Sequence, residues 1–370
     1  MADSPQVAIL LPNLRGGGAE RVCVNLANAF VARGLNVDMV LMQTEGELQP
    51  LLDPHVKVVD LGAPQVRNLF GPLARYLRER RPAAVLANMW PLTMMAVAVA
   101  RMTRARARVV VVEHCNWTAF MPTHKWLHRI ALRWSMRWLM PLAQVRVGVS
   151  GGVARDLEKI ASLPSGAVLT VFNPVVGIPG TISLPTPDEF AAQWLAGGHK
   201  RIIAVGTLKA QKRFDRLIEA FARLTGNDAR LLILGEGEER PTLEALAEKL
   251  GVLGRIDMPG FVCDPTPMFR KADLFVLSSD YEGFGNVVVE ALEQGVPVVS
   301  TDCPSGPREI LEDGKYGTLV PVGDVDALAH AMQEALSRTH DHEALKRRAQ
   351  DFSVDMAADA YLDLLLPSAV

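Results

Sequence analysis

The sequence has few cysteines and no long apolar run, and each absence excludes a class of protein. Its four cysteines form no C-x-x-C pair, which argues against a cysteine-ligated metal cluster and favours buried thiols in a reducing compartment. The most apolar stretch, residues 92–100, is too short to span a bilayer. The N-terminus lacks the basic region and cleavage site of a signal peptide. We therefore expect a cytoplasmic protein, or one bound peripherally to a membrane. The cysteines are Cys23, Cys115, Cys263 and Cys303.

The chain also has little net charge, and this balance conceals an uneven distribution. The formal charge is −2 at pH 7. Residues 1–176 carry 20 Lys and Arg against 11 Asp and Glu, whereas the remaining residues carry 19 against 30. The two halves therefore face different partners. No nucleic-acid-binding module accompanies the basic half, so we expect no nucleic acid partner.

Strands and helices alternate along all 370 residues, a length that suits two domains. Such alternation predicts parallel sheets covered by helices on both faces. A proline-rich stretch at residues 173–187 is the best linker. The sequence thus predicts an α/β protein with two doubly wound, Rossmann-like domains, residues 1–175 and 176–352, that face each other across a cleft. A C-terminal helix at about 353–370 is expected to pack back on the first domain. The predicted strands are 7–12, 36–42, 56–60, 84–88, 108–113, 145–149, 201–205, 229–234, 256–258, 272–279 and 297–301.

Residues 282–290 read EGFGNVVVE and carry the strongest functional signal. They follow a predicted strand and open a predicted helix, with Asn286 at the N-cap position, so freed N–H groups and the helix dipole favour a phosphate. The glycines allow the backbone to approach a ligand closely. Two carboxylates beside a phosphate are unfavourable unless hydroxyls donate to them, and sugars supply such hydroxyls. The segment therefore predicts a sugar-nucleotide site. Its candidate residues are Glu282, Gly283, Phe284, Gly285, Asn286, Val287 and Glu290.

Two further loops follow predicted strands. Gly16, Gly17 and Gly18 in RGGGAER suit a second phosphate site, and a plain tight turn is the alternative. A dinucleotide fingerprint fails because Arg21 occupies its third glycine position. After the strand at 201–205, three cations are placed to neutralise a leaving diphosphate. These cations are Lys209, Lys212 and Arg213, and Gly206, Thr207 and Phe261 complete the substrate-binding set.

Together with GTLKAQKRFDRLIEAF, LGEGEERPTLEALAEKLG and DCPSGPREIL, these segments resemble the retaining glycosyltransferases of family 4, which have the GT-B fold. The resemblance implies that Glu282 contacts the transferred sugar, Glu290 holds the ribose and Lys212 binds the diphosphate. It also implies that His114, after the strand VVVVE, lies beside the reacting sugar. One departure is Thr207, where the family has arginine; Lys209 or Arg213 would replace it. We expect Glu282, His114 and Lys212 to be catalytic, with Ser150 and Asn173 as weaker candidates.

Residues 117–146 combine tryptophans with basic residues. Arg129, Arg133 and Arg137 lie four residues apart, on one stripe of a predicted helix, and Trp134 and Trp138 lie on an adjacent stripe. Such a surface suits an anionic bilayer or a lipid diphosphate acceptor. The alternative is an ordinary solvated helix face over a tryptophan core.

These features predict a retaining hexosyltransferase that uses a nucleotide sugar, with UDP-sugar favoured over GDP-sugar. The acceptor is expected to be a hydroxyl of a lipid-linked or polysaccharide acceptor in cell-surface glycan biosynthesis, such as lipopolysaccharide. No cofactor or metal is expected, because cations and the helix dipole supply the charge. Two alternatives are a GT-B epimerase and a non-catalytic nucleotide-sugar sensor or scaffold.

Overall fold

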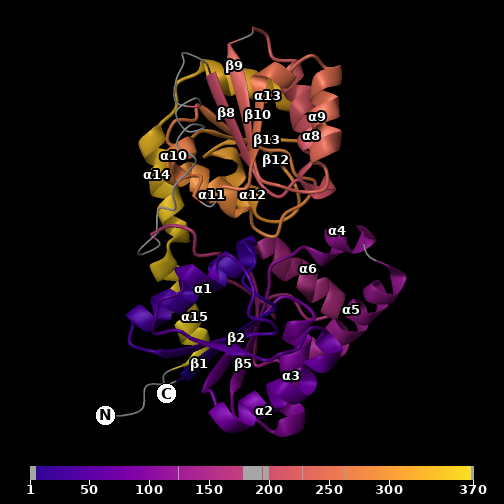
Figure 1. Cartoon of the computed structure of the whole chain (residues 1–370), viewed down its shortest axis with the longest axis vertical. Helices are drawn as coiled ribbons and strands as arrows, with labels where there is room; N and C mark the ends of the chain where they lie inside the picture. Colours follow the sequence, from indigo (N-terminus) through magenta and orange to yellow (C-terminus); the bar gives the residue numbers. More distant parts are fainter. Residues whose placement is uncertain are drawn as a thin grey trace. The chain divides into compact units, whose positions relative to one another are not determined.

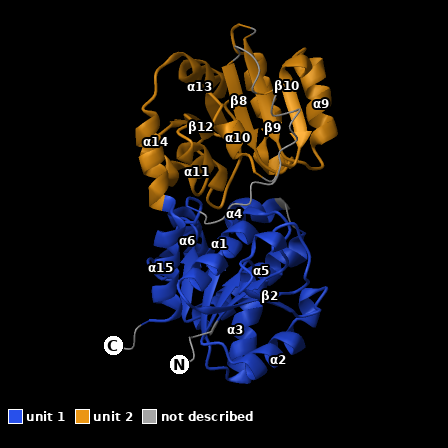
Figure 2. Cartoon of the chain, turned by 60° about the vertical axis from the view of Figure 1, so that its left-hand side comes forward, with its two compact units in different colours: residues 1–181, 352–370 blue, residues 182–351 orange. Residues whose placement is uncertain are grey.

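A computed structural model describes residues 6–123, 125–177, 194, 200–226, 228–262 and 264–367. The chain divides into two compact units (Figure 2). Unit 1 holds residues 1–181 and 352–370, and unit 2 holds residues 182–351. The units meet in sequence at residues 181 and 182, whereas the sequence-based boundary is set at 175 and 176. Most of the predicted linker, residues 178–187, lies outside the described part of the chain.

Unit 1 contains a parallel sheet in the order β3-β2-β1-β4-β5-β6-β7. β1 lies between β2 and β4, so the strand order reverses there, and loops that follow β1 and β4 diverge at the carboxyl edge. β5 reads RVVVVE and is buried on both faces, as expected for a central parallel strand. The strands are β1 Gln6–Leu11, β2 Asn36–Leu41, β3 Lys57–Asp60, β4 Ala84–Asn88, β5 Arg108–Glu113, β6 Val145–Gly148 and β7 Leu169–Thr170.

Helices cover both faces of this sheet, with α1 and α15 on one side and α2, α3 and α5 on the other (Figure 1). The C-terminal helix α15 belongs to unit 1, although unit 2 intervenes in the sequence. Arg33, the C-cap of α1, pairs with Asp355 and Asp359 of α15, and Tyr361 of α15 is buried. The helices are α1 Gly18–Ala32, α2 Phe70–Arg80, α3 Leu92–Thr103, α4 Trp117–Phe120, α5 Trp126–Leu139, α6 Gly151–Ala161 and α15 Val354–Leu365.

Unit 2 contains a second parallel sheet in the order β10-β9-β8-β11-β12-β13. Here β8 lies between β9 and β11, which places the reversal of strand order beside the loops that follow β8 and β11. The strands are β8 Lys200–Val205, β9 Ala229–Leu234, β10 Ile256–Gly260, β11 Leu274–Leu277, β12 Val298–Thr301 and β13 Thr318–Val320.

The helices of unit 2 also lie on both faces of its sheet (Figure 1). α8, α9 and α13 enclose a core with Phe214, Phe221 and Met332, while α11 packs against α14. The helices are α8 Phe214–Ala222, α9 Arg240–Lys249, α10 Thr266–Phe269, α11 Asn286–Glu293, α12 Pro307–Ile310, α13 Val325–Ser337 and α14 His342–Ala349.

The predicted pair of doubly wound α/β units is confirmed, with differences in detail. The short strands β7 and β13 were not predicted, because two or three residues are too few to show a periodic pattern. Cys23 and Cys303 are buried as expected, but Cys115 is only partly buried. Cys263 lies outside the described residues. Within the described chain, no helix is both long and apolar enough to cross a membrane.

Candidate functional site

In unit 2, the loop after β8 places the side chain of Lys212 against the backbone of Gly206. Lys212 ends the short turn Ala210–Lys212. A Cβ added to Gly206 would lie 3.1 Å from Cε of Lys212. Gly206 therefore leaves room for the aliphatic part of the lysine side chain to lie against the backbone. Gly206 and Lys212, both candidate substrate-binding residues, thus lie side by side.

Lys212 reaches the buried Glu282 in the loop after β11. Its Nζ lies 2.7 Å from Oε1 of Glu282, and the Ser279 hydroxyl donates to the same oxygen at 2.6 Å. The Ser279 carbonyl in turn accepts a hydrogen bond from Thr301 Oγ1 at 2.6 Å. The side chains of Lys212 and Glu282 are 18% and 9% exposed, so solvent screens this ion pair only weakly. The sequence did not identify Ser279 as a site residue.

Arg213 has a different set of partners. It pairs with Asp215 and Asp280, and Arg216 also pairs with Asp280. These contacts join the loop after β8 to the loop after β11. Arg213 is therefore already engaged. Lys209 is exposed and makes no ion pair within the described chain.

The start of α11 differs from the prediction in one residue. Gly285, not Asn286, is the N-cap, and its φ of +98° is in the left-handed region that favours glycine. Asn286 is the first residue of the helix. Phe284 is buried, and a Cβ on Gly306 would clash with the Phe284 carbonyl. Two loops thus pack closely at this helix start, whose first N–H groups could donate to an anion.

The remaining predicted residues of unit 2 are more scattered. Gly283, Val287 and Glu290 are all partly buried, and Glu290 lies on α11. Thr207 is exposed in the loop after β8. Phe261 is 58% exposed after β10, two strands away from β8 in the sheet. The structure therefore unites Gly206, Lys212 and Glu282 by direct contacts, but shows no such contact for Phe261.

In unit 1, His114 follows β5 and contacts Asn88 at the end of β4. Its Nε2 lies 3.1 Å from Oδ1 of Asn88, whose Nδ2 donates to the Leu86 carbonyl. The imidazole proton therefore sits on Nε2, which leaves Nδ1 as an acceptor. Nδ1 is buried, and none of the described residues gives it a hydrogen-bond partner. Burial lowers the pKa of His114 to about 4, so the ring is neutral near pH 7.

Glu113, which the sequence analysis did not single out, is buried at the end of β5. Its carboxylate accepts hydrogen bonds from the Trp90 backbone, the Thr93 hydroxyl and the Trp117 indole. Burial raises its pKa to about 7, although these three donors oppose the shift. The only sequence signal was a carboxylate that ends an otherwise apolar strand.

The glycine loop after β1 contains a carboxylate contact that the prediction omitted. α1 begins at Gly18 with Gly17 as its N-cap, as a phosphate-binding turn requires. The Gly16 N–H, however, donates to Glu47 at 3.2 Å. Hydrogen bonds from the backbone N–H groups of Glu47 and Gly16 lower the pKa of that carboxyl. An anion bound at Gly16 would therefore have to displace Glu47.

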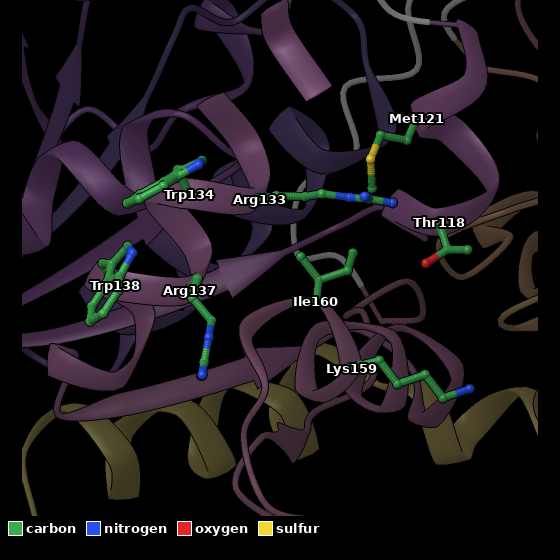
Figure 3. A pocket seen from close by; sticks show the side chains of 8 residues that line it. All are labelled: Thr118, Met121, Arg133, Trp134, Arg137, Trp138, Lys159 and Ile160. Carbon is green, nitrogen blue, oxygen red and sulfur yellow. The ribbon is translucent and has the colours of Figure 1, made fainter. Parts of the chain in front are cut away.

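The surface of α5 contains the groove shown in Figure 3. The groove has a volume of about 550 Å³ and lies between α5 and α6. Trp134 and Trp138 are both 63% exposed, which contradicts the alternative of a buried tryptophan core on this face. Arg137 donates to the carbonyls of Ala161 and Ser162 at the end of α6, so it also has a structural role. The lining residues are Thr118, Met121, Arg133, Trp134, Arg137, Trp138, Lys159 and Ile160.

Other candidates have structural partners. The Ser150 hydroxyl caps α6 by accepting a hydrogen bond from the Val153 N–H at 3.1 Å. Asn173 is buried in unit 1. Among the residues that the structure describes, no group of three or more His, Cys, Asp or Glu side chains could hold a metal ion.

Comparisons with known proteins assign the family. The model for "Glycosyltransferase Family 4" matches residues 16–176, and that for "Glycosyl transferases group 1" matches residues 186–352. Lipopolysaccharide core biosynthesis glycosyltransferase LpsE of Rhizobium meliloti is 39% identical over 44% of this chain. That match spans only about half of LpsE, 49% of its length.

Two further proteins match nearly the whole chain. The N-acetylgalactosamine-N,N'-diacetylbacillosaminyl-diphospho-undecaprenol 4-alpha-N-acetylgalactosaminyltransferase of Campylobacter jejuni is 26% identical over 93% of this chain and 94% of its own. The structure of Anabaena Alr3699/HepE in complex with UDP-glucose has a TM-score of 0.80 at 19% identity. The match covers 97% of this chain and 99% of the Anabaena chain. At this identity it supports a shared fold and nothing more. The chain therefore belongs to the family-4 glycosyltransferases and has the GT-B fold.

Proposed function

We propose that this glycosyltransferase transfers a hexosyl unit from a nucleotide sugar to a hydroxyl of a lipid-linked or polysaccharide acceptor, with retention of anomeric configuration. The product would be a cell-surface glycan such as lipopolysaccharide. The observation that carries the proposal is the Lys212–Glu282 ion pair beside the N-terminus of α11. Two adjoining loops thus hold a cation, a carboxylate that would bind the sugar, and a helix start that would bind an anion.

UDP-sugar is the preferred donor in this proposal, and GDP-sugar is the second choice. Support comes from the Anabaena protein, whose structure holds UDP-glucose. Lys212 would exchange Glu282 for the diphosphate, and the first N–H groups of α11 would donate to the same phosphates. Glu282 would then accept hydrogen bonds from sugar hydroxyls, and Glu290 would accept those of the ribose.

The proposed chemistry is a front-face displacement. The bond between the anomeric carbon and the diphosphate oxygen breaks, and the acceptor oxygen bonds to that carbon on the same face. The acceptor proton passes to the leaving diphosphate, whose charge Lys212 and Lys209 stabilise. The bare Nδ1 of neutral His114 would accept a hydrogen bond from a hydroxyl of the transferred sugar. We expect no metal requirement, because these groups supply the positive charge.

The acceptor is proposed to approach along α5, at the cytoplasmic face of a membrane. The groove contains the cations Arg133, Arg137 and Lys159 and no acidic side chain. The exposed rings of Trp134 and Trp138 provide apolar surface beside them (Figure 3). Cations beside exposed tryptophans suit a lipid with an anionic headgroup. The membrane and lipid-linked acceptor proposals rest on this combination.

Binding and turnover can be tested separately. We expect UDP or a UDP-sugar to raise the melting temperature more than GDP or a GDP-sugar. We also expect transfer of labelled sugar from UDP-sugars into membrane extract, unchanged in the presence of EDTA. Binding without any turnover would instead indicate a sensor or scaffold. Conversion of the donor sugar without an acceptor would indicate an epimerase.

A further inference from the structure

Glu113 is a buried carboxylate that the proposed transfer does not use. It is 1% exposed, and within the described chain it has no ion-pair partner. Its Oε1 accepts a hydrogen bond from Thr93 Oγ1 at 2.6 Å. Its Oε2 accepts hydrogen bonds from the Trp90 N–H and from Trp117 Nε1, both at 3.1 Å. All of the donors thus come from segments that surround the end of β5.

Residues 88–93 make hydrogen bonds to both Glu113 and its neighbour His114. Trp90 and Thr93 lie between β4 and the first turn of α3, and Asn88, the hydrogen-bond partner of His114, ends β4. Asn88 is two residues from Trp90 in sequence. Consecutive residues at the end of β5 therefore fix residues 88–93 at two points. A shift of residues 88–93 would move Asn88, whose side chain orients the imidazole of His114.

The hydrogen-bond network continues to α5. The Trp90 indole donates to Ser135 Oγ on α5 at 2.8 Å. The rings of Trp90 and Trp117 meet edge to face with their centroids 5.8 Å apart. Glu113 therefore links the strand end that carries His114 to the helix that lines the groove.

A purely structural role would not require a carboxylate here. Burying a charge costs free energy, and an apolar or amide side chain of similar size would fill the same space at lower cost. Burial raises the pKa of Glu113 to about 7, because its charged form is less favourable away from water. Costly buried ionisable groups are concentrated at functional sites.

We propose that Glu113 is a positioning residue, which holds residues 88–93 so that His114 Nδ1 faces the transferred sugar, and which links this segment to α4 and α5. The proposal rests on the proposed sugar transfer. Glu113 itself touches no substrate and acts through Asn88 and His114.

Three conservative variants test this role. Trp117→Phe keeps an aromatic ring and removes one donor to Glu113. Thr93→Val keeps the side-chain shape and removes another. Glu113→Gln keeps the shape and removes the charge. The control is Thr103→Val, because its hydroxyl donates to the Val99 carbonyl in the same helix, away from Glu113.

We expect kcat to fall by about 10- to 100-fold in the three variants, since small displacements of a sugar contact have effects of this size. The affinity for UDP should not change, because the proposed nucleotide contacts lie in unit 2. The ¹⁵N imidazole resonances of His114 should shift in each variant and stay unchanged in Thr103→Val.

Unchanged His114 resonances together with wild-type kcat would overturn the proposal and leave Glu113 a structural residue. Failure of wild-type protein to transfer sugar would count against the proposed function instead. The His114 resonances would still decide whether Glu113 positions the imidazole. If Glu113→Gln does not fold, the Trp117 and Thr93 variants provide the same test.

Discussion

Lys212 and Glu282 are the residues on which the proposed donor site depends most. In the structure they neutralise each other at 2.7 Å, and the diphosphate is proposed to replace Glu282 as the partner of Lys212. Lys212→Ala should lower kcat/KM by about 10²- to 10³-fold, because a preorganised group would be lost from the developing charge. Steady-state kinetics with a UDP-sugar measures this effect.

The matched control for this variant is Lys249→Ala, which removes an exposed lysine at the end of α9. It should keep wild-type kinetics. If Lys212→Ala also retained wild-type kcat/KM, the diphosphate would have to bind elsewhere, and the assignment of the donor site would be wrong.

Glu113 gives a prediction for stability against pH. Its folded pKa of about 7 is above the value of 4.5 for a free glutamate, so between these values the folded state binds more protons than the unfolded state. The free energy of unfolding should therefore decrease as pH rises from 4.5 to 7, by up to about 3 kcal/mol. Glu113→Gln should lack this contribution.

Urea unfolding of wild type and Glu113→Gln at the same pH values isolates the contribution of Glu113 to the free energy of unfolding. The comparison is needed because His114, with its pKa lowered to about 4, contributes the opposite slope between its folded value and 6.5. A difference between the two proteins that does not vary from pH 5 to pH 7.5 would show that Glu113 has an ordinary pKa.

Single residues also show where sequence reasoning about the site stops. The segment EGFGN indicates an anion site at a helix start, and the structure has such a start, but Gly285 is the cap where Asn286 was expected. Asn286 is instead the first residue of the helix, and Gly285 has a left-handed φ of +98°, a conformation that glycine adopts readily. Glu113 was not identified because two of its three hydrogen-bond donors, Trp90 and Thr93, come from a segment distant in sequence. Ser279 was not identified because its contact with Glu282, three residues away, depends on how the loop folds.

At the scale of secondary-structure elements, the proposed binding of an anionic surface depends on α5. Replacing Arg129 and Arg133 with Glu should weaken binding to vesicles that contain phosphatidylglycerol by about 30-fold or more, since each basic residue contributes about 1 kcal/mol. Arg137 is left in place because it also donates to the carbonyls of α6. Co-sedimentation at low and high salt measures the effect.

A suitable control replaces Arg78, an exposed arginine of α2, with Glu. This variant should bind vesicles as wild type does. Equal sedimentation of all variants, or of wild type with phosphatidylcholine vesicles alone, would contradict electrostatic binding through α5.

The long elements followed from sequence periodicity, and their ends followed from local chemistry. α11 ends at Glu293, and beyond it the N–H groups of Gly295 and Val296 donate to the carbonyls of Leu292 and Ala291. The strands β7 and β13 could not be predicted, because their pairing with neighbouring strands, and not their own sequence, defines them. The groove beside α5 likewise requires that α6 packs against α5, which the sequence of neither helix reveals.

At the scale of the whole molecule, the last helix of the chain, α15, packs against α1, β4 and β5 of unit 1. Tyr361 of α15 is 1% exposed, so Tyr361→Ala should lower the free energy of unfolding by about 3–5 kcal/mol. The matched variant Asp363→Ala changes an exposed residue of the same helix and should have little effect. Urea unfolding followed by circular dichroism compares the two, and equal stabilities would show that α15 contributes little to unit 1.

The sequence by itself determined the alternation of strands and helices, the two doubly wound units and the loops that carry glycines, cations and carboxylates. These features depend on residues close together in the chain. Only the tertiary structure decided that Lys212 pairs with Glu282, that Arg213 is held by Asp215 and Asp280, and that Glu113 joins three segments around His114. Such contacts arise from strand order, because parallel strands bring distant loops to one edge of a sheet.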